Sequence, residues 1–77
     1  MKVTIEFFGQ LTDISKTKTY DITDVSDTDT AMTKLYEKFP TFQSAKFIIA
    51  VNNLIIHQNT ELTGETVIAL MPPYSGG

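Results

Sequence analysis

The sequence predicts a small α+β fold in which one main helix packs on one face of a mixed sheet of about five strands. Three observations indicate this: period-two alternation near the N-terminus, one apolar stripe at helical spacing, and short apolar runs between turn residues in the second half. The chain has 77 residues, of which 42% are hydrophobic and 19% charged. These values are typical of one small folded domain.

The N-terminal third predicts a β-hairpin. Residues 2–8 alternate apolar and polar side chains, except that Phe8 lies on the polar face. Gly9 ends this strand, and residues 10–15 form a short connector with room for one helical turn. Residues 17–23 alternate again, so we expect a second strand that pairs with the first.

The middle of the chain predicts the main helix. Its apolar stripe at i, i+3, i+4 and i+7 consists of Met32, Leu35, Tyr36 and Phe39. Pro40 ends the helix, because proline lacks the N–H that the helix ladder needs. Ser26, with Asp29 three residues later, resembles a capping box at the helix N-terminus.

Three further strands are expected in the second half. Residues 47–51 are apolar on both faces, as in a central strand, and Asn52-Asn53 supplies a turn into a short strand over 54–56. The last strand covers residues 67–71.

The order of these elements is β-β-α-β-β-β. If the first and last strands are parallel neighbours, the connection between them must cross over, and the helix supplies that crossover. This is the ubiquitin-like β-grasp arrangement.

The sheet face away from the helix carries more apolar side chains than a solvated face requires. We expect Ile68 and Leu70 to point inward, so that Met71 leaves the sheet on the same side as Phe8. The predicted outer patch consists of Phe8, Ile55, Ala69 and Met71. A contiguous apolar patch marks a partner site, although these side chains could instead cover a secondary core beneath the loop at 58–62.

Residues 72–77 predict an extended tail behind a domain of residues 1–71. The tail consists of Pro72, Pro73, Tyr74, Ser75, Gly76 and Gly77. The prolines keep its root extended, and the two glycines remove every side chain beside the terminal carboxylate. Six extended residues reach roughly 20 Å. We therefore expect the tail to carry its C-terminus into the active site of a partner.

Composition excludes several function classes. The chain has no cysteine, which removes disulfides, thiolate nucleophiles and zinc-finger patterns. Its net charge is −3, and its basic residues are all lysines, which argues against a nucleic-acid partner. No apolar run is long enough for a membrane span, and the N-terminus does not resemble a signal peptide. We expect a cytoplasmic protein with no membrane partner.

No catalytic or metal-binding constellation is apparent. His57 is the only histidine, and in its polar loop we expect a solvated surface residue. Four acids form a run without EF-hand spacing, which we expect to complement the helix N-terminus. They are Asp21, Asp24, Asp27 and Asp29. The α-carboxylate of Gly77 is left as the one chemically unusual group.

Four stretches carry a resemblance to a known family: residues 3–11, 50–52, 62–69 and, above all, the Pro-Pro-Tyr-Ser-Gly-Gly ending at 72–77. They resemble the MoaD/ThiS family of sulfur carriers, and within it the MoaD branch, the small subunits of molybdopterin synthase. The resemblance runs essentially from end to end. It implies the β-grasp fold and an apolar docking surface at Phe8, Ile55 and Met71.

The resemblance also implies a chemistry for Gly77. A MoeB-like activating enzyme adenylates the carboxylate with ATP and magnesium, neither of which this chain itself binds. A cysteine desulfurase or rhodanese-like donor then supplies sulfur, giving a thiocarboxylate. The tail enters the large subunit of molybdopterin synthase and donates sulfur to cyclic pyranopterin monophosphate, within a heterotetramer. The chain alone is not catalytic.

Two alternatives stay open. The chain could carry sulfur in another pathway, such as thiazole (thiamine) or cysteine synthesis, which needs the same tail with other partners. It could also be a ubiquitin-like modifier that is conjugated to lysines of target proteins.

Overall fold

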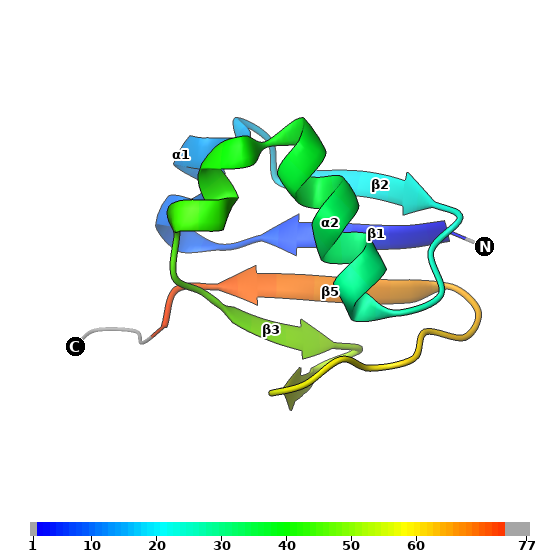
Figure 1. Cartoon of the computed structure of the whole chain (residues 1–77). Coiled ribbons are helices and arrows are strands. Elements are labelled where there is room, and N and C mark those ends of the chain that lie inside the picture. The colour runs from blue at the N-terminus through cyan, green and yellow to red at the C-terminus, as the bar shows by residue number, and fades with distance from the viewer. Residues whose placement is uncertain (1, 74–77) are drawn as a thin grey trace.

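The computed structural model describes residues 2–73 (Figure 1). The strands are β1 (Lys2–Phe7), β2 (Thr19–Thr23), β3 (Ile48–Val51), β4 (Leu54–Ile56) and β5 (Thr66–Met71), and the helices are α1 (Thr12–Ser15) and α2 (Thr28–Lys38). Single 3-10 segments lie at Gly9–Leu11 and Pro40–Ser44. Within residues 2–73, no helix is both long and apolar enough to cross a membrane.

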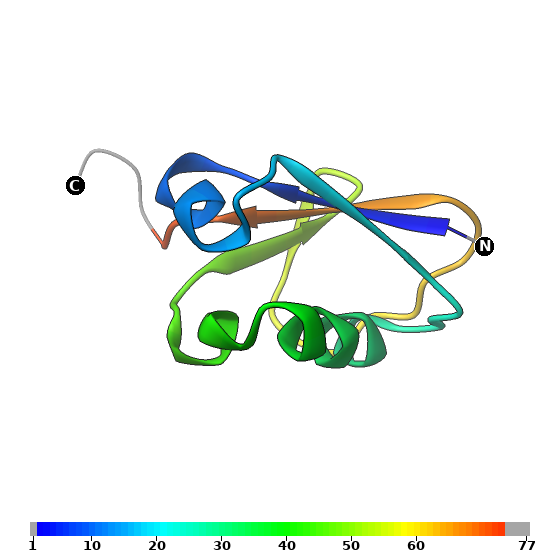
Figure 2. The ribbon, with the colours of Figure 1, turned by 90° about the horizontal axis from the view of Figure 1, so that it is seen from above.

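The five strands form one mixed sheet in the order β2-β1-β5-β3-β4. β1 and β5 are parallel neighbours in the middle, and the other neighbours are antiparallel. Viewed from above, α2 lies on one side of the sheet (Figure 2). These features confirm the predicted fold class. Because β1 and β5 run in the same direction, their carboxyl ends meet at the end of the sheet from which the tail leaves (Figure 1).

The core lies between the sheet and α2. Its largest fully buried side chains are Phe42, Ile5, Leu35, Ile68, Leu70 and Val3. Each contributes about 1.5–3 kcal/mol by leaving water. The aromatic rings of Phe7 and Phe42 stack at 5.4 Å between centroids, and Phe39 meets both edge-on. The segment after Pro40 therefore adds a major core residue, Phe42, to the predicted helical stripe.

The N-cap of α2 differs from the prediction. Asp27, not Ser26, caps the helix, and its Oδ1 accepts a hydrogen bond of 2.9 Å from the Thr30 N–H. The Ser26 carbonyl instead accepts from the Leu62 N–H at 2.9 Å. Hydrogen bonds to its carboxylate hold the pKa of Asp27 below its ordinary value of 3.8. The largest contribution comes from the Thr30 side chain, followed by the Thr30 backbone and the Asn59 side chain.

Two strand boundaries in the first hairpin also shift. β1 ends at Phe7, although the Phe8 N–H still donates to the Leu70 carbonyl at 3.0 Å. β2 begins at Thr19 because the chain before it is held in a turn: Lys16 has φ 62°, and the Ser15 hydroxyl donates to the Thr17 carbonyl at 2.6 Å. The first strand thus stops one residue before the aromatic side chain that turns outward.

Candidate partner-binding face and tail root

Strand register decides which side chains share the outer face of the sheet. Ile68 and Leu70 are fully buried on the helix side, as predicted. Their neighbours in β5 therefore point outward, because side chains alternate along a strand. Met71 pairs with Ile48 of β3, while Ala69 pairs with Ala50, which in turn pairs with Ile55 of β4. The outer face thus carries two rows of apolar side chains that cross the strands. One row consists of Met71 and Ile48, and the other of Ala69, Ala50 and Ile55.

The outer rows are exposed to different degrees. Phe8 and Ile55 keep 45% and 51% of their residue surface accessible, whereas Ala69 and Met71 are half-buried. Ala50 is buried but does not belong to the core cluster on the helix side. Its neighbours on the outer face therefore cover it, and that face has a small apolar layer of its own.

Three of the four predicted patch residues gather around one hollow at the root of the tail. The hollow has a volume of about 490 Å³ and is lined by Phe8, Gly9, Ile48, Ile55, Met71, Pro72 and Pro73. Ala69 does not line it and lies beside it on β5. Phe8, Ile55 and Met71 therefore form one continuous surface with the predicted tail root, and we call this surface the root hollow.

Ile48 and Gly9 line the root hollow but were missed from the sequence. Ile48 belongs to a run that is apolar on both faces, so its orientation follows only from its pairing with Met71. For Gly9, the sequence predicts only that the first strand ends there. In the structure it has φ 57°, and a Cβ built on it would lie 3.0 Å from Pro72 Cγ. Its missing side chain lets the tail root pack against the end of β1.

Pro72 is half-buried and Pro73 is exposed at the rim of the root hollow. The other tail residues of the prediction, Tyr74, Ser75, Gly76 and Gly77, lie outside the described residues. The structure thus defines where the tail starts and which surface surrounds its start.

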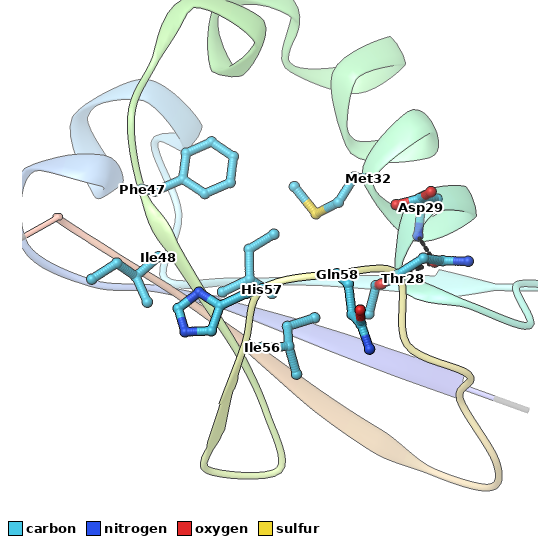
Figure 3. A pocket seen from close by; sticks show the side chains of 10 residues that line it. Thr28, Asp29, Met32, Phe47, Ile48, Ile56, His57 and Gln58 are labelled. Atoms are coloured by element: carbon cyan, nitrogen blue, oxygen red, sulfur yellow. Dashed lines mark hydrogen bonds between the residues drawn. The ribbon is translucent and has the colours of Figure 1, made fainter.

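A second hollow, of about 310 Å³, lies between the start of α2 and the β3–β4 hairpin (Figure 3). His57 is exposed and lines it together with side chains such as Met32 and Ile56. Asn59 Oδ1 accepts from the Asp29 N–H at 2.8 Å and the Thr28 hydroxyl at 3.1 Å. The polar groups at this helix end are therefore satisfied by the chain itself.

The same contacts place the loop at 58–62 on the helix side of the sheet. Leu62 is buried in the main core, and Thr28 and Thr60 exchange two hydrogen bonds of 2.9 Å. The loop therefore does not cover the exposed side chains of Phe8 and Ile55. The alternative in which the outer patch caps a secondary core beneath this loop is not realised.

The four acids of the predicted run have separate structural positions. Asp27 caps α2 and Asp29 lies in its first turn, in agreement with the prediction. Asp21 Oδ1 accepts from the Thr4 hydroxyl at 2.9 Å across the β1–β2 pair, and Asp24 has φ 62° in the following turn. Among residues 2–73, no three His, Cys, Asp or Glu side chains are grouped so as to hold a metal ion.

A five-stranded mixed sheet with one crossover helix, and with an apolar hollow where the C-terminal segment leaves it, defines the chain as a ubiquitin-like β-grasp protein. A family model described as the ThiS family matches residues 5–77. The chain belongs to the ThiS family. No curated protein matches the sequence.

Solved structures agree with this assignment. A chain from the complex of subunits 1 and 2 of molybdopterin-converting factor of Helicobacter pylori is 32% identical, with a TM-score of 0.75 and 100% of both chains covered. SAMP1 from Haloferax volcanii is 18% identical, with a TM-score of 0.84 and both chains fully covered. Small archaeal modifier protein 1 from Methanosarcina acetivorans is 19% identical, with a TM-score of 0.82, covering 99% of this chain and 96% of that chain. The latter two share the fold.

Proposed function

We propose that this chain is a sulfur carrier that acts as the small subunit of molybdopterin synthase in the cytoplasm. The observation that carries the proposal is the root hollow, because it joins an exposed apolar surface directly to the start of a glycine-ended tail. A partner that covers this hollow also receives the tail. Docking and delivery of the C-terminus are then one event.

The chemistry would occur at the Gly77 carboxylate. Attack of this carboxylate on the α-phosphate of ATP releases pyrophosphate and gives an acyl adenylate, in the active site of a MoeB-like activating enzyme that holds the magnesium. The terminal sulfur of a persulfide on a cysteine desulfurase or rhodanese-like donor would then attack the acyl carbon and displace AMP. A second thiol would reduce the resulting acyl disulfide, which releases the donor as a disulfide and leaves a thiocarboxylate on Gly77. In the active site of the large subunit, that sulfur would form a carbon–sulfur bond to cyclic pyranopterin monophosphate. Water would then hydrolyse the bond between the acyl carbon and the sulfur, which returns the carboxylate.

Each tail residue has a part in this scheme. Gly76 and Gly77 keep the chain thin enough for a narrow channel, because no Cβ projects beside the acyl carbon. Pro72 and Pro73 stiffen the segment that leaves the root hollow. Between them, Tyr74 and Ser75 supply length, so that the acyl group reaches a site away from the sheet.

The activating enzyme and the large subunit would use the same docking surface: Phe8, Ile55, Ala69 and Met71. The two complexes would therefore exclude each other. This mutual exclusion is chemically useful, because the acyl group must leave the site of adenylation before it can donate sulfur.

Two other functions use the same tail. Sulfur carriers for thiazole or cysteine synthesis differ only in their partners, and ubiquitin-like modifiers join the tail to lysines instead. The 32% identity to a chain of the Helicobacter pylori converting-factor complex, over the full length of both chains, supports the molybdopterin pathway.

Reconstitution with purified components tests the proposal. The chain is incubated with a MoeB-like enzyme, ATP, magnesium and a sulfur donor, and then with the large subunit and cyclic pyranopterin monophosphate. We expect molybdopterin from the full chain and none from a chain that lacks Gly77, with both chains equally folded by circular dichroism. Molybdopterin formation by the truncated chain would contradict the proposal, and lysine adducts in place of molybdopterin would favour the modifier function.

A further inference from the structure

The two free edges of the sheet differ in charge. β2, at one edge, contains Asp21 and is flanked by Lys18 and Asp24. β4, at the other edge, lies in a stretch from 47 to 60 that has no lysine, arginine, aspartate or glutamate. Charged side chains normally keep an edge strand from pairing with another chain. The β4 edge has no such protection in its own sequence.

The backbone of Ile55 points to this free edge. The Asn52 N–H donates to the Val67 carbonyl at 2.8 Å, so even-numbered residues of β3 face β5 and odd-numbered ones face β4. Val51 pairs with Leu54, and Ile49 pairs with Ile56. Because backbone groups alternate in direction along a strand, the N–H and C=O of Ile55 face away from β3.

The side chains of β4 at this edge are also exposed to solvent. Leu54 is 70% exposed and Ile55 is 51% exposed, on opposite faces of β4. Ile55 lines the root hollow on the outer face, while Ile56 lines the hollow next to α2 on the inner face (Figure 3). A strand laid along β4 would thus find a hollow on each face for its alternating side chains: the apolar root hollow on the outer face, and a hollow of mixed apolar and polar lining on the inner face.

We propose that the partner that covers the root hollow also adds an extended segment to β4, with hydrogen bonds to the N–H and C=O of Ile55. The inference rests on the proposed function, since it concerns the same large-subunit partner. The occupant is an uncharged segment with an apolar side chain toward the root hollow, because neither the β4 edge nor the root hollow offers it a charged partner. Main-chain pairing supplies affinity, and the alternating side chains supply specificity.

Asp21 provides a matched control at the other edge. The Phe7 N–H donates to the Lys18 carbonyl at 2.9 Å, so odd-numbered residues of β1 face β2. Tyr20 and Ile22 pair with Ile5 and Val3, which leaves the N–H of Asp21, between them, at the free edge of β2. Asp21 and Ile55 therefore occupy equivalent backbone positions on opposite edges.

Amide hydrogen exchange measured by NMR on the labelled chain, free and bound to the large subunit, tests the inference. We expect the Ile55 amide to exchange at least roughly tenfold more slowly in the complex, as one hydrogen bond implies, while the Asp21 amide is unchanged. A complex in which the Ile55 amide is not slowed overturns strand addition but leaves the proposed function standing. Failure to form a complex overturns both.

Chemical synthesis supplies a second test that keeps the side chain. N-methylation of Ile55 removes the edge donor, and N-methylation of Asp21 does the same at the other edge. We expect at least roughly fivefold weaker binding to the large subunit for the first chain and unchanged binding for the second. Equal affinity of the two N-methylated chains for the large subunit would overturn the inference. Slow exchange of the Ile55 amide in a concentrated sample of the free chain would also overturn it, because β4 would then pair with a second copy of the chain.

Discussion

Gly9 and Pro72 are 63 positions apart in the sequence but touch where the tail leaves the sheet. A Cβ on Gly9 would lie 3.0 Å from Pro72 Cγ and 3.5 Å from Pro72 Cδ. The contact exists because β1 and β5 are parallel neighbours, so both carboxyl ends meet at one end of the sheet. It sets the direction in which the tail starts, and through Phe8 and Met71 it joins the tail to the outer patch.

Replacing Gly9 by alanine tests this contact, and Gly64 offers a matched control. Both glycines have positive φ, 57° and 70°, but a Cβ on Gly64 meets nothing within 4 Å. Gly64→Ala should lower the free energy of unfolding by about 1–2 kcal/mol through backbone strain alone. Gly9→Ala should lower it further and should also weaken binding of the large subunit, because Pro72 must shift. Denaturant titrations measure the loss of unfolding free energy. If the two variants lost equal unfolding free energy and bound the large subunit equally well, the role of the contact would be contradicted.

If the outer patch docks the large subunit as proposed, Met71→Asp and Phe8→Asp should weaken the complex. A carboxylate that must be desolvated in an apolar contact should cost about 2 kcal/mol or more, which is roughly a thirtyfold loss of affinity. Calorimetry measures the loss. Val67→Asp is the control, because Val67 is also exposed and lies outside the lining of the root hollow. Unchanged binding of the Met71 variant would contradict the assignment of the interface.

The cap at Asp27 predicts a pH dependence of stability. Hydrogen bonds from Thr30 and Asn59 lower the pKa of Asp27 in the folded chain below 3.8, so the unfolded chain binds the proton more tightly. The stabilisation by the Asp27 carboxylate is therefore fully present above pH 3.8. It is lost as the pH falls through the pKa of Asp27 in the folded chain. Thermal unfolding should separate the wild type from Asp27→Asn at neutral pH, and the gap should close in strong acid. Asp13→Asn controls for net charge, and a gap that persists in acid would contradict this account.

Much of the fold could be predicted from local patterns. Alternation marked β1, and the stripe from Met32 to Phe39 marked α2, because each pattern has one period and one buried face. The pair Asn52-Asn53, both at positive φ, marked the hairpin. The sequence does not locate the helix cap to the residue, because Ser26 and Asp27 are both good cap residues. Contacts with a distant loop distinguish them: Asn59 donates to the Asp27 carboxylate, and the Leu62 N–H donates to the Ser26 carbonyl.

The candidate site was predictable only in part. Phe8, Ile55 and Met71 stood out as apolar side chains on a face that should be polar, and the structure brings them together. Ile48 could not be placed, since a strand that is apolar on both faces does not reveal its orientation. The contact of Gly9 with Pro72 depends on strand pairing across the whole chain, which no local pattern encodes.

The central claim is that Gly77 carries sulfur. Intact-mass analysis of the chain isolated from its host tests this most directly. The account predicts a population that is heavier by one exchange of oxygen for sulfur, located at the C-terminus by fragmentation and lost when the activating enzyme is deleted. A chain that carries only the carboxylate in cells that make molybdopterin, or one found only in isopeptide linkage to lysines of other proteins, would contradict it.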